Sequence, residues 1–269
     1  MHAATFETFA TLLRSRSGLV IGPDKHYLLE TRLTPIIKRE GLRDLASLAE
    51  RLRNSLAEAL ARDVVEAMTT NESLFFRDDK PFAHLREEAL PQLLAARPAG
   101  AALRIWSAAS SSGQEAYSVA MTLAECRALV GDRRIEILGT DIARDQLARA
   151  REGLYTQFEV QRGLPMQMLI KYFRKEAMGF RINEAMRAAV AFREWNLLSD
   201  LRPLGTFDIV FCRNVLIYFD QATKARVLGA IAQLMPADGI LDLGGAETVL
   251  GITDRFAALP GQPCAYGRV

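Results

Sequence analysis

Two acidic side chains beside runs of small residues are the first candidates for chemistry in this sequence. Glu115 comes just after six small residues, Ala108–Gly113, and Asp141 closes the segment Gly139–Asp141. A turn of small residues lets a nucleotide lie against the backbone, because no large side chain holds it away. An acid just beyond a second strand is placed to accept hydrogen bonds from both hydroxyls of a ribose.

Glu115 also bears on which nucleotide fits. A dinucleotide pyrophosphate favours several glycines and a free helix N-terminus, and only Gly113 matches such a fingerprint. Glu115 in the first turn of the next helix is a poor neighbour for phosphate, but a fair one for a cationic or hydroxyl-bearing ligand. This favours S-adenosylmethionine over NAD. As a structural alternative, Asp141 is the N-cap of the helix from Ala143 onward, and one carboxylate can serve both purposes.

Three further polar residues, Asn71, Ser73 and Arg77, surround the aromatic pair Phe75-Phe76. The aromatic pair suits an ordered connector that plugs a seam between domains. The three polar side chains beside this aromatic pair can then point into a cleft.

The elements that position these residues alternate between strands and helices from residue 102 onward. Strands are expected at Leu103–Trp106, Ile135–Leu138, Val190–Trp195 and Ile240–Leu243, with an antiparallel pair at the end of the chain. The near-continuous apolar run Phe207–Cys212 is typical of a central parallel strand. Arg213-Asn214 then falls at its carboxyl end, where open α/β sheets bind ligands.

A small inserted subdomain is expected at about residues 158–188, where the alternation is interrupted. Pro165–Lys175 reads as a short helix, and Phe180–Ile182 reads as a strand. The inserted hairpin is placed at Phe180–Val190.

The first 70 residues predict helices only. Asp44 is expected to cap one helix, and Ser55–Glu58 forms a capping box that opens another. We therefore expect a helical domain over residues 1–70, a connector and linker helix over 71–98, and an α/β domain over 99–269.

Composition excludes several classes of protein. The 269 residues carry a formal net charge of +2, too little to predict nucleic-acid binding, and three widely spaced cysteines favour neither disulfides nor a metal site. No apolar run approaches the ~20 residues that span a bilayer, and the N-terminus has no signal pattern. A soluble cytoplasmic protein without membrane insertion is expected.

Basic residues are in excess on the predicted helices between Arg14 and Arg43, with seven basic residues against three acidic ones. A solvated helix face is one interpretation, and a docking face for an acidic partner helix is the other. No aromatic residues interleave with these charges, which does not favour nucleic acid. The side chains expected to point outward are Lys25, Arg32, Lys38, Arg39 and Arg43.

Several stretches together resemble the chemotaxis receptor methyltransferases (CheR type). They are M-T-T-N-E-S-L-F-F-R-D, R-I-W-S-A-A-S-S-S-G-Q-E-A-Y-S, G-T-D-I-A, the stretch around Trp195-Asn196-Leu197, and F-D-I-V-F-C-R-N-V-L-I-Y-F-D. The likeness runs in order over nearly the whole chain. It implies a Rossmann-like class I methyltransferase sheet, S-adenosylmethionine as methyl donor, S-adenosylhomocysteine as product, and glutamates on the cytoplasmic helices of chemoreceptors as acceptors.

The resemblance also implies roles for particular residues. Asn71, Ser73 and Arg77 fall at the methionine end of the cofactor, Glu115 in the motif that closes the cofactor turn, and Asp141 on the ribose. The adenine and the floor of the cofactor site are lined by Asn196, Leu197 and the Arg213-Asn214 pair. Catalytic roles fall to Arg77, which can hold the carboxylate of the substrate or of the cofactor, and to Tyr218. Tyr218 can orient the acceptor oxygen or border the methyl group, and a half-buried ring at a helix start is the structural alternative.

The sequence also leads to expectations about the partner of this protein and about its competing functions. A monomer acting on acidic receptor helices is expected, with no nucleic-acid partner. The segment Phe180–Val190 is shorter than the inserted hairpin of members that tether to a receptor's C-terminal peptide, which does not favour tethering. A cofactor-binding scaffold without turnover and a nucleic-acid methyltransferase are the competing functions; amine-methylating enzymes usually carry Asn/Asp-Pro-Pro-aromatic where this chain has Arg213–Leu216.

Overall fold

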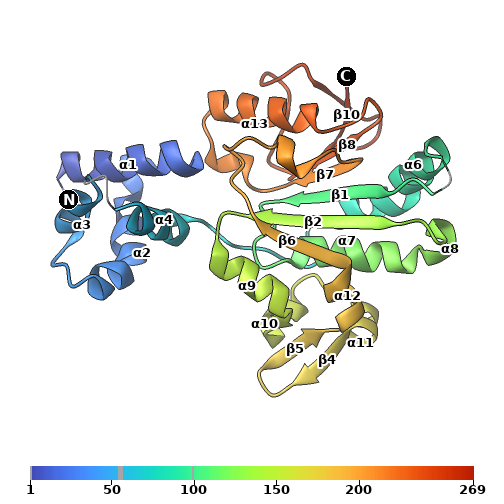
Figure 1. The fold of residues 1–269 in the computed structure, drawn as a ribbon, viewed down its shortest axis with the longest axis horizontal. Coiled ribbons are helices and arrows are strands. Elements are labelled where there is room, and N and C mark those ends of the chain that lie inside the picture. The colour runs from blue at the N-terminus through green and yellow to red at the C-terminus, as the bar shows by residue number, and fades with distance from the viewer. Residues whose placement is uncertain (1, 54–56, 99) are drawn as a thin grey trace. The chain divides into compact units, whose positions relative to one another are not determined.

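The computed structural model describes residues 2–53, 57–98 and 100–269, and this part of the chain divides into two compact units (Figure 1). The first comprises the residues up to Thr70 together with Tyr218–Thr223, and the second comprises Asn71–Ile217 and Lys224–Val269. The predicted capping box at Ser55 lies outside the described residues. No helix in the described ranges is long and apolar enough to cross a membrane.

Helices alone form the N-terminal part of the first unit, as its sequence predicts. They are α1 (Ala3–Ser17), the 3-10 helix η1 (Pro23–Lys25), α2 (His26–Arg39), α3 (Leu45–Leu52) and α4 (Glu58–Met68). Apolar side chains at helical spacing, such as Phe9 and Leu13 on α1 and Leu29 and Leu33 on α2, are fully buried. Asp44 caps α3 as expected, because its carboxylate accepts the Ser47 N–H at 2.8 Å.

A seven-stranded sheet forms the second unit, in the order β6-β2-β1-β7-β8-β10-β9. Its strands are β1 (Leu103–Ala108), β2 (Ile135–Asp141), β6 (Val190–Glu194), β7 (Ile209–Cys212), β8 (Ile240–Leu243), β9 (Phe256–Ala258) and β10 (Ala265–Arg268). The five strands from β6 to β8 are parallel, whereas β10 runs antiparallel to both β8 and β9. The predicted α/β fold with a terminal antiparallel pair is therefore confirmed.

Helices precede β1 and connect the parallel strands (Figure 1). They are α5 (Lys80–His84), the π-helical turn η2 (Leu85–Ala89), α6 (Leu90–Ala96), α7 (Gln114–Glu125), α8 (Arg127–Val130), α9 (Arg144–Glu152), the 3-10 helices η3 (Arg202–Leu204) and η4 (Leu216–Tyr218), and α13 (Gln221–Gln233). The apolar side chains of α7 pack in the core with those of β1, β2 and β6. All residues of β7 are buried, as expected for a strand covered on both faces.

The insertion between α9 and β6 differs from its prediction. It holds a three-stranded sheet in the order β3-β5-β4, made of β3 (Leu154–Tyr155), β4 (Phe173–Glu176) and β5 (Gly179–Ile182), with helices α10 (Gln157–Gln161), α11 (Met166–Tyr172) and α12 (Glu184–Ala189). The hairpin is formed by β4 and β5, so its placement at Phe180–Val190 is wrong. The helix-forming run Glu184–Ala189 begins α12 under an Asn183 cap, and Val190 already belongs to the large sheet.

The strand register brings the carboxyl ends of the central strands to one edge. Ala108 on β1 pairs with Thr140 on β2 and with Cys212 on β7. The turn after β1, Asp141 at the end of β2 and Arg213 after β7 therefore lie at the same edge of the sheet, where open α/β sheets bind ligands.

Candidate functional site

The turn after β1 has an unusual backbone. Ala109 and Ser111 have φ values of 56° and 50°, and Gly113 has a φ of 92°. In the described chain, the six non-glycine residues with positive φ lie in the connector (Phe76, Asp78, Asp79), in this turn (Ala109, Ser111) and after β7 (Asn214). Left-handed backbone costs such residues on the order of 1 kcal/mol each, so strain is concentrated around this edge of the sheet.

Packing and hydrogen bonds from outside fix the turn after β1, and they leave no room for a side chain at Gly113. A Cβ atom on Gly113 would lie 3.0 Å from Ala150 Cβ and from the Phe192 ring. Ser111 donates its hydroxyl to the carbonyl of Asn71 at 3.0 Å, and Tyr155 donates its hydroxyl to the carbonyl of Ser112 at 2.7 Å. The turn is thus held from both sides by groups outside it.

The carboxylate of Asp141 is buried and already accepts hydrogen bonds from backbone N–H groups. One carboxylate oxygen accepts the N–H of Ser111 and the other that of Ala143, both at 2.8 Å. Burial raises the pKa of Asp141, and the N–H donors of Ala143 and Ser111 oppose that rise. The Ile142 N–H also acts on this carboxylate, and since a carboxylate has about four acceptor positions, one remains for a hydroxyl.

Glu115 and Arg213 form a buried ion pair at 3.1 Å. Glu115 also accepts the Ser107 hydroxyl at 2.8 Å. Burial raises the pKa of Glu115, while the Arg213 charge and the Ser107 hydrogen bond oppose the rise. The Arg213 side chain is 1% exposed and donates to the Arg77 carbonyl at 2.8 Å and to Asp78 at 2.7 Å, so it ties the connector to α7.

Two polar residues of the connector contribute backbone carbonyls to this edge. The carbonyls of Asn71 and Arg77 accept the hydrogen bonds from Ser111 and Arg213. The side chains of Asn71, Ser73 and Arg77 are half-buried, and the Arg77 guanidinium makes a long 3.4 Å contact with the Glu72 carbonyl. Their expected role at the methionine end stays a prediction.

Asn196 and Leu197 lie beside Asp141, because the Trp195 N–H donates to the Asp141 carbonyl at 2.9 Å. Asn196 closes a turn by accepting the Leu198 N–H at 2.9 Å, and Leu197 is buried. Asn214 takes the left-handed conformation directly after Arg213. The expected adenine-side residues therefore border the same edge of the sheet.

Tyr218 groups with the first unit, where its carbonyl accepts the Val20 N–H at 2.9 Å. Its side chain is half-buried. Tyr218 thus belongs to the first unit, whereas Glu115, Asp141 and Arg213 belong to the second, and its catalytic role stays a prediction.

The expected docking residues behave in two ways. Lys25, Lys38 and Arg43 are exposed and form no ion pair with another described residue. Arg32 is half-buried instead, because its guanidinium donates to the carbonyls of Met68 at 2.7 Å and Thr69 at 2.9 Å. The expectation that Arg32 points outward is wrong, since it satisfies carbonyls at the end of α4 that the helix leaves unpaired.

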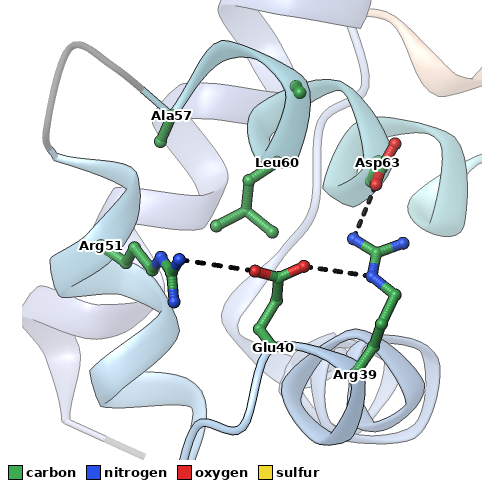
Figure 2. A pocket seen from close by; sticks show the side chains of 7 residues that line it. Arg39, Glu40, Arg51, Ala57, Leu60 and Asp63 are labelled. Carbon is green, nitrogen blue, oxygen red and sulfur yellow. Dashed lines mark hydrogen bonds and ion pairs between the residues drawn. The ribbon is translucent and has the colours of Figure 1, made fainter.

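Arg39 lines a shallow pocket of the first unit, and its charge is engaged there. Figure 2 shows its guanidinium between Asp63 and Glu40, at 2.6 and 3.1 Å, with Arg51 reaching Glu40 from the other side at 3.7 Å. The pocket is lined by two arginines and two carboxylates, so its charges compensate one another within the unit.

The residues at the sheet edge fit S-adenosylmethionine. Asp141 and Glu115 supply buried acceptors suited to ribose hydroxyls and to a cationic group. In the described structure Ser110 Oγ, Trp195 Nε1 and Arg213 Nε are buried without a hydrogen-bond partner. Unpaired buried polar atoms are costly, so polar groups left open at this edge indicate a place for a polar ligand.

Several residues of this site escape sequence reasoning. Asp78 stands in the recognised F-F-R-D stretch, but nothing in the stretch shows that it pairs with Arg213. Tyr155 and Glu247 hold backbone groups from 43 and about 30 residues away along the chain. No local spacing marks such contacts.

A sheet of five parallel strands with an antiparallel strand beside β8, a small-residue turn after β1 and an acid at the end of β2 are typical of the Rossmann-like fold of class I methyltransferases.

Comparison with known proteins gives the family. Residues 71–264 match the CheR methyltransferase, SAM binding domain, and residues 4–69 match the CheR methyltransferase, all-alpha domain. The chain therefore belongs to the CheR methyltransferase family, and its cofactor is S-adenosylmethionine.

Relatives match over nearly their whole length. Chemotaxis protein methyltransferase Cher2 of Pseudomonas putida is 37% identical over 262 residues, with 96% of this chain and 95% of the relative covered. The chemotaxis protein methyltransferase of Escherichia coli is 32% identical over 265 residues, with 96% and 89% covered. Among solved structures, PKMT2 from Rickettsia typhi aligns with a TM-score of 0.39 and 13% identity over 65% of this chain and 26% of that one. The family assignment rests on the sequence relatives.

Proposed function

We propose that this protein transfers a methyl group from S-adenosylmethionine to glutamate side chains on the cytoplasmic helices of chemoreceptors, forming methyl esters in chemosensory adaptation. The observation that carries the proposal is the family match over both parts of the chain, with full-length relatives named chemotaxis protein methyltransferases. The buried Glu115, Asp141 and Arg213 at the sheet edge support it.

The chemistry needs no general base. A glutamate has a reference pKa of about 4.3, so the acceptor is already an ionised nucleophile near neutral pH. When bound, S-adenosylmethionine supplies an electrophilic methyl group on its sulfonium. The receptor carboxylate forms the carbon–oxygen bond as the carbon–sulfur bond breaks, and no proton moves. The protein contributes alignment and exclusion of water.

We propose the following roles for this chain's residues on the family match. Asp141 holds the ribose hydroxyls, and Glu115 with its partner Arg213 forms the floor beneath the cofactor turn. Asn71, Ser73 and Arg77 hold the methionine end, and Asn196, Leu197 and Asn214 border the adenine. Arg77 and Tyr218 act on the reacting groups, with Tyr218 orienting the acceptor oxygen.

The partner is an acidic helical surface. Lys25, Lys38 and Arg43 are exposed basic residues without an ion pair to another described residue, which supports docking of acidic receptor helices on the first unit. We further propose that the protein works as a monomer in the cytoplasm, where the methylated parts of receptors lie.

A transfer assay tests the function. Labelled S-adenosylmethionine is offered with a receptor cytoplasmic fragment, with the same fragment carrying glutamine at the acceptor glutamates, with RNA, or with no acceptor. We expect label only on the unaltered fragment, released as methanol by mild alkali because carboxyl methyl esters hydrolyse there. Tyr218→Phe should lower this transfer without lowering fold stability. Cofactor binding without transfer to any acceptor would instead identify a scaffold, and alkali-stable label on RNA would identify a nucleic-acid methyltransferase.

A further inference from the structure

Glu247 lies in the loop after β8 and gathers backbone donors from two loops at once. Its Oε2 accepts the N–H of Asn214 at 2.6 Å and that of Gly244 at 2.7 Å. Its Oε1 accepts the N–H groups of residues 215, 216 and 217 at 2.9, 2.7 and 3.3 Å. The residue is 9% exposed. One carboxylate thus holds five backbone N–H groups.

These donors belong to a stretch that has no other regular partner. The chain leaves β7 at Cys212, takes a left-handed turn at Asn214, and enters the short helix η4 at Leu216. The first N–H groups of a helix have no partner within it, and unpaired buried N–H groups are costly. Glu247 supplies that partner from 30 to 33 residues further along the chain.

The space around the carboxylate is closed. A Cβ atom on Gly244 would lie 2.7 Å from Glu247 Oε2 and 2.7 Å from the Asn214 side-chain amide. Real Cβ atoms do not approach other atoms so closely. Glycine at position 244 therefore allows the loops after β7 and β8 to meet at the carboxylate.

We propose that Glu247 is a positioning residue for methyl transfer, which acts by fixing the backbone of residues 214–217. This proposal rests on the proposed function. On one side of the held stretch is Arg213, which pairs with Glu115 at the cofactor site. On the other side the chain continues into Tyr218, the proposed acceptor-orienting residue. Among the described residues, no hydrogen bond or ion pair joins Glu247 to either of these side chains, so it acts through the loop.

The chemistry of the contact makes glutamine an informative substitution. Each carboxylate oxygen accepts at least two N–H groups, and a glutamine side chain of the same shape keeps only one acceptor oxygen. Its NH2 group then faces either two or three N–H donors. Glu247→Gln therefore loosens the stretch without removing bulk.

The matched control is Asp208→Asn. Asp208 is 8% exposed and accepts the Arg104 N–H at 2.8 Å, along with Arg97 at 2.7 Å, directly before the same strand β7. It lies at the opposite end of that strand from Glu247. Both variants neutralise a buried carboxylate that holds backbone, and only one of them touches the loop at the site.

The experiment measures hydrogen exchange, cofactor affinity and steady-state transfer to a receptor fragment. We expect Glu247→Gln to speed amide exchange at residues 214–217 and to lower kcat at least tenfold, with a smaller rise in cofactor Kd. The rise in Kd stays smaller because the Arg213–Glu115 pair does not involve Glu247, and only Asn214 beside the adenine is loosened. Asp208→Asn should leave kcat within twofold, whatever it does to the unfolding midpoint. If Glu247→Gln does not fold, Gly244→Ala disturbs the same contact and should give the same loss of kcat.

Two results overturn the proposal. One is parental kcat in a folded Glu247→Gln variant of an enzyme that methylates the fragment, which leaves the proposed function standing. The other is an equal loss of kcat in Asp208→Asn, which would show a general effect of losing a buried carboxylate. A parent protein that binds cofactor and methylates no fragment is a separate result, because it overturns the proposed function before any variant is made.

Discussion

Charged side chains differ between the two units in how far they are exposed to water. In the helical unit, Arg39 and Arg51 are each 52% exposed and pair with carboxylates in contact with water. In the α/β unit, Arg213 is 1% exposed and its partner Glu115 13% exposed, and both are tied to the cofactor edge of the sheet. Water screens the first kind of pair and hardly screens the second. Exposed charges are therefore suited to meeting a partner, and buried charges to holding a geometry.

Arg213→Met should have the largest effect of the variants that test this contrast between buried and exposed charges. It leaves Glu115 buried without its counter-charge and frees the Arg77 carbonyl, so we expect a loss of about 3–5 kcal/mol in the free energy of unfolding. Denaturant unfolding measures this loss, and calorimetry should show cofactor binding abolished. Arg39→Met is the corresponding variant in the helical unit, and its free energy of unfolding should fall far less. Equal losses in the two variants would contradict the contrast between the units.

Asp141→Ala should have the next largest effect, on cofactor affinity. It removes a charged acceptor from the ribose and also releases the N–H groups of Ser111 and Ala143. We expect the binding free energy to weaken by about 1.5–3 kcal/mol. This raises the Kd of both S-adenosylmethionine and its demethylated product roughly 10- to 150-fold. Calorimetric titration with each ligand measures it. Parental affinity in this variant would remove Asp141 from the cofactor site.

Two buried tyrosines allow a finer test of how the cofactor turn is held. Tyr155 donates to the Ser112 carbonyl in the turn, and Tyr117 donates to the Ala150 carbonyl at the end of α9, both at 2.7 Å. Each Tyr→Phe change should lower stability by about 0.5–1.5 kcal/mol. Only Tyr155→Phe should also raise cofactor Kd, by a few fold, because only it loosens the turn. A matching rise in Tyr117→Phe would show that the effect comes from the core in general.

The smallest effects are expected for the exposed charges. Reversal of Lys25 and Lys38 to glutamate should raise the KM for receptor severalfold at low ionic strength and leave cofactor Kd unchanged, and added salt should weaken the parent in the same way. Arg39 is unsuitable for this test, since its reversal would break the pair with Asp63. Lys175→Glu on the β4–β5 hairpin is the comparison variant. Should it alone raise KM, receptor docking belongs to the inserted subdomain.

Sequence reasoning succeeded where a property repeats along the chain. The apolar run before Cys212 identifies a central strand, and a parallel sheet then requires Asp141 and Arg213 to reach the same edge. The motif stretches added the family. These inferences need only periodicity, strand order and residues close in sequence.

Sequence reasoning failed where a contact joins distant segments. The pairing of Arg32 with the end of α4 joins residues 36 and 37 positions apart, and Glu247 reaches Asn214 over 33 positions. The hairpin prediction at Phe180–Val190 is wrong for a more local reason, because the six residues after Asn183 form the helix α12 and not a strand. Side-chain hydrogen bonds to distant backbone have no periodic signature, so they are found only in the folded chain.

The left-handed residues around the site have a consequence for how this protein can be evolved. Glycine adopts such a conformation without strain, so Ala109→Gly should raise the melting temperature slightly, although alanine-to-glycine changes usually lower it. The same change gives the turn more conformations to choose from, and a looser turn binds its ligand less well. Selection for heat resistance should therefore accept glycine at position 109, whereas selection for turnover should restore alanine.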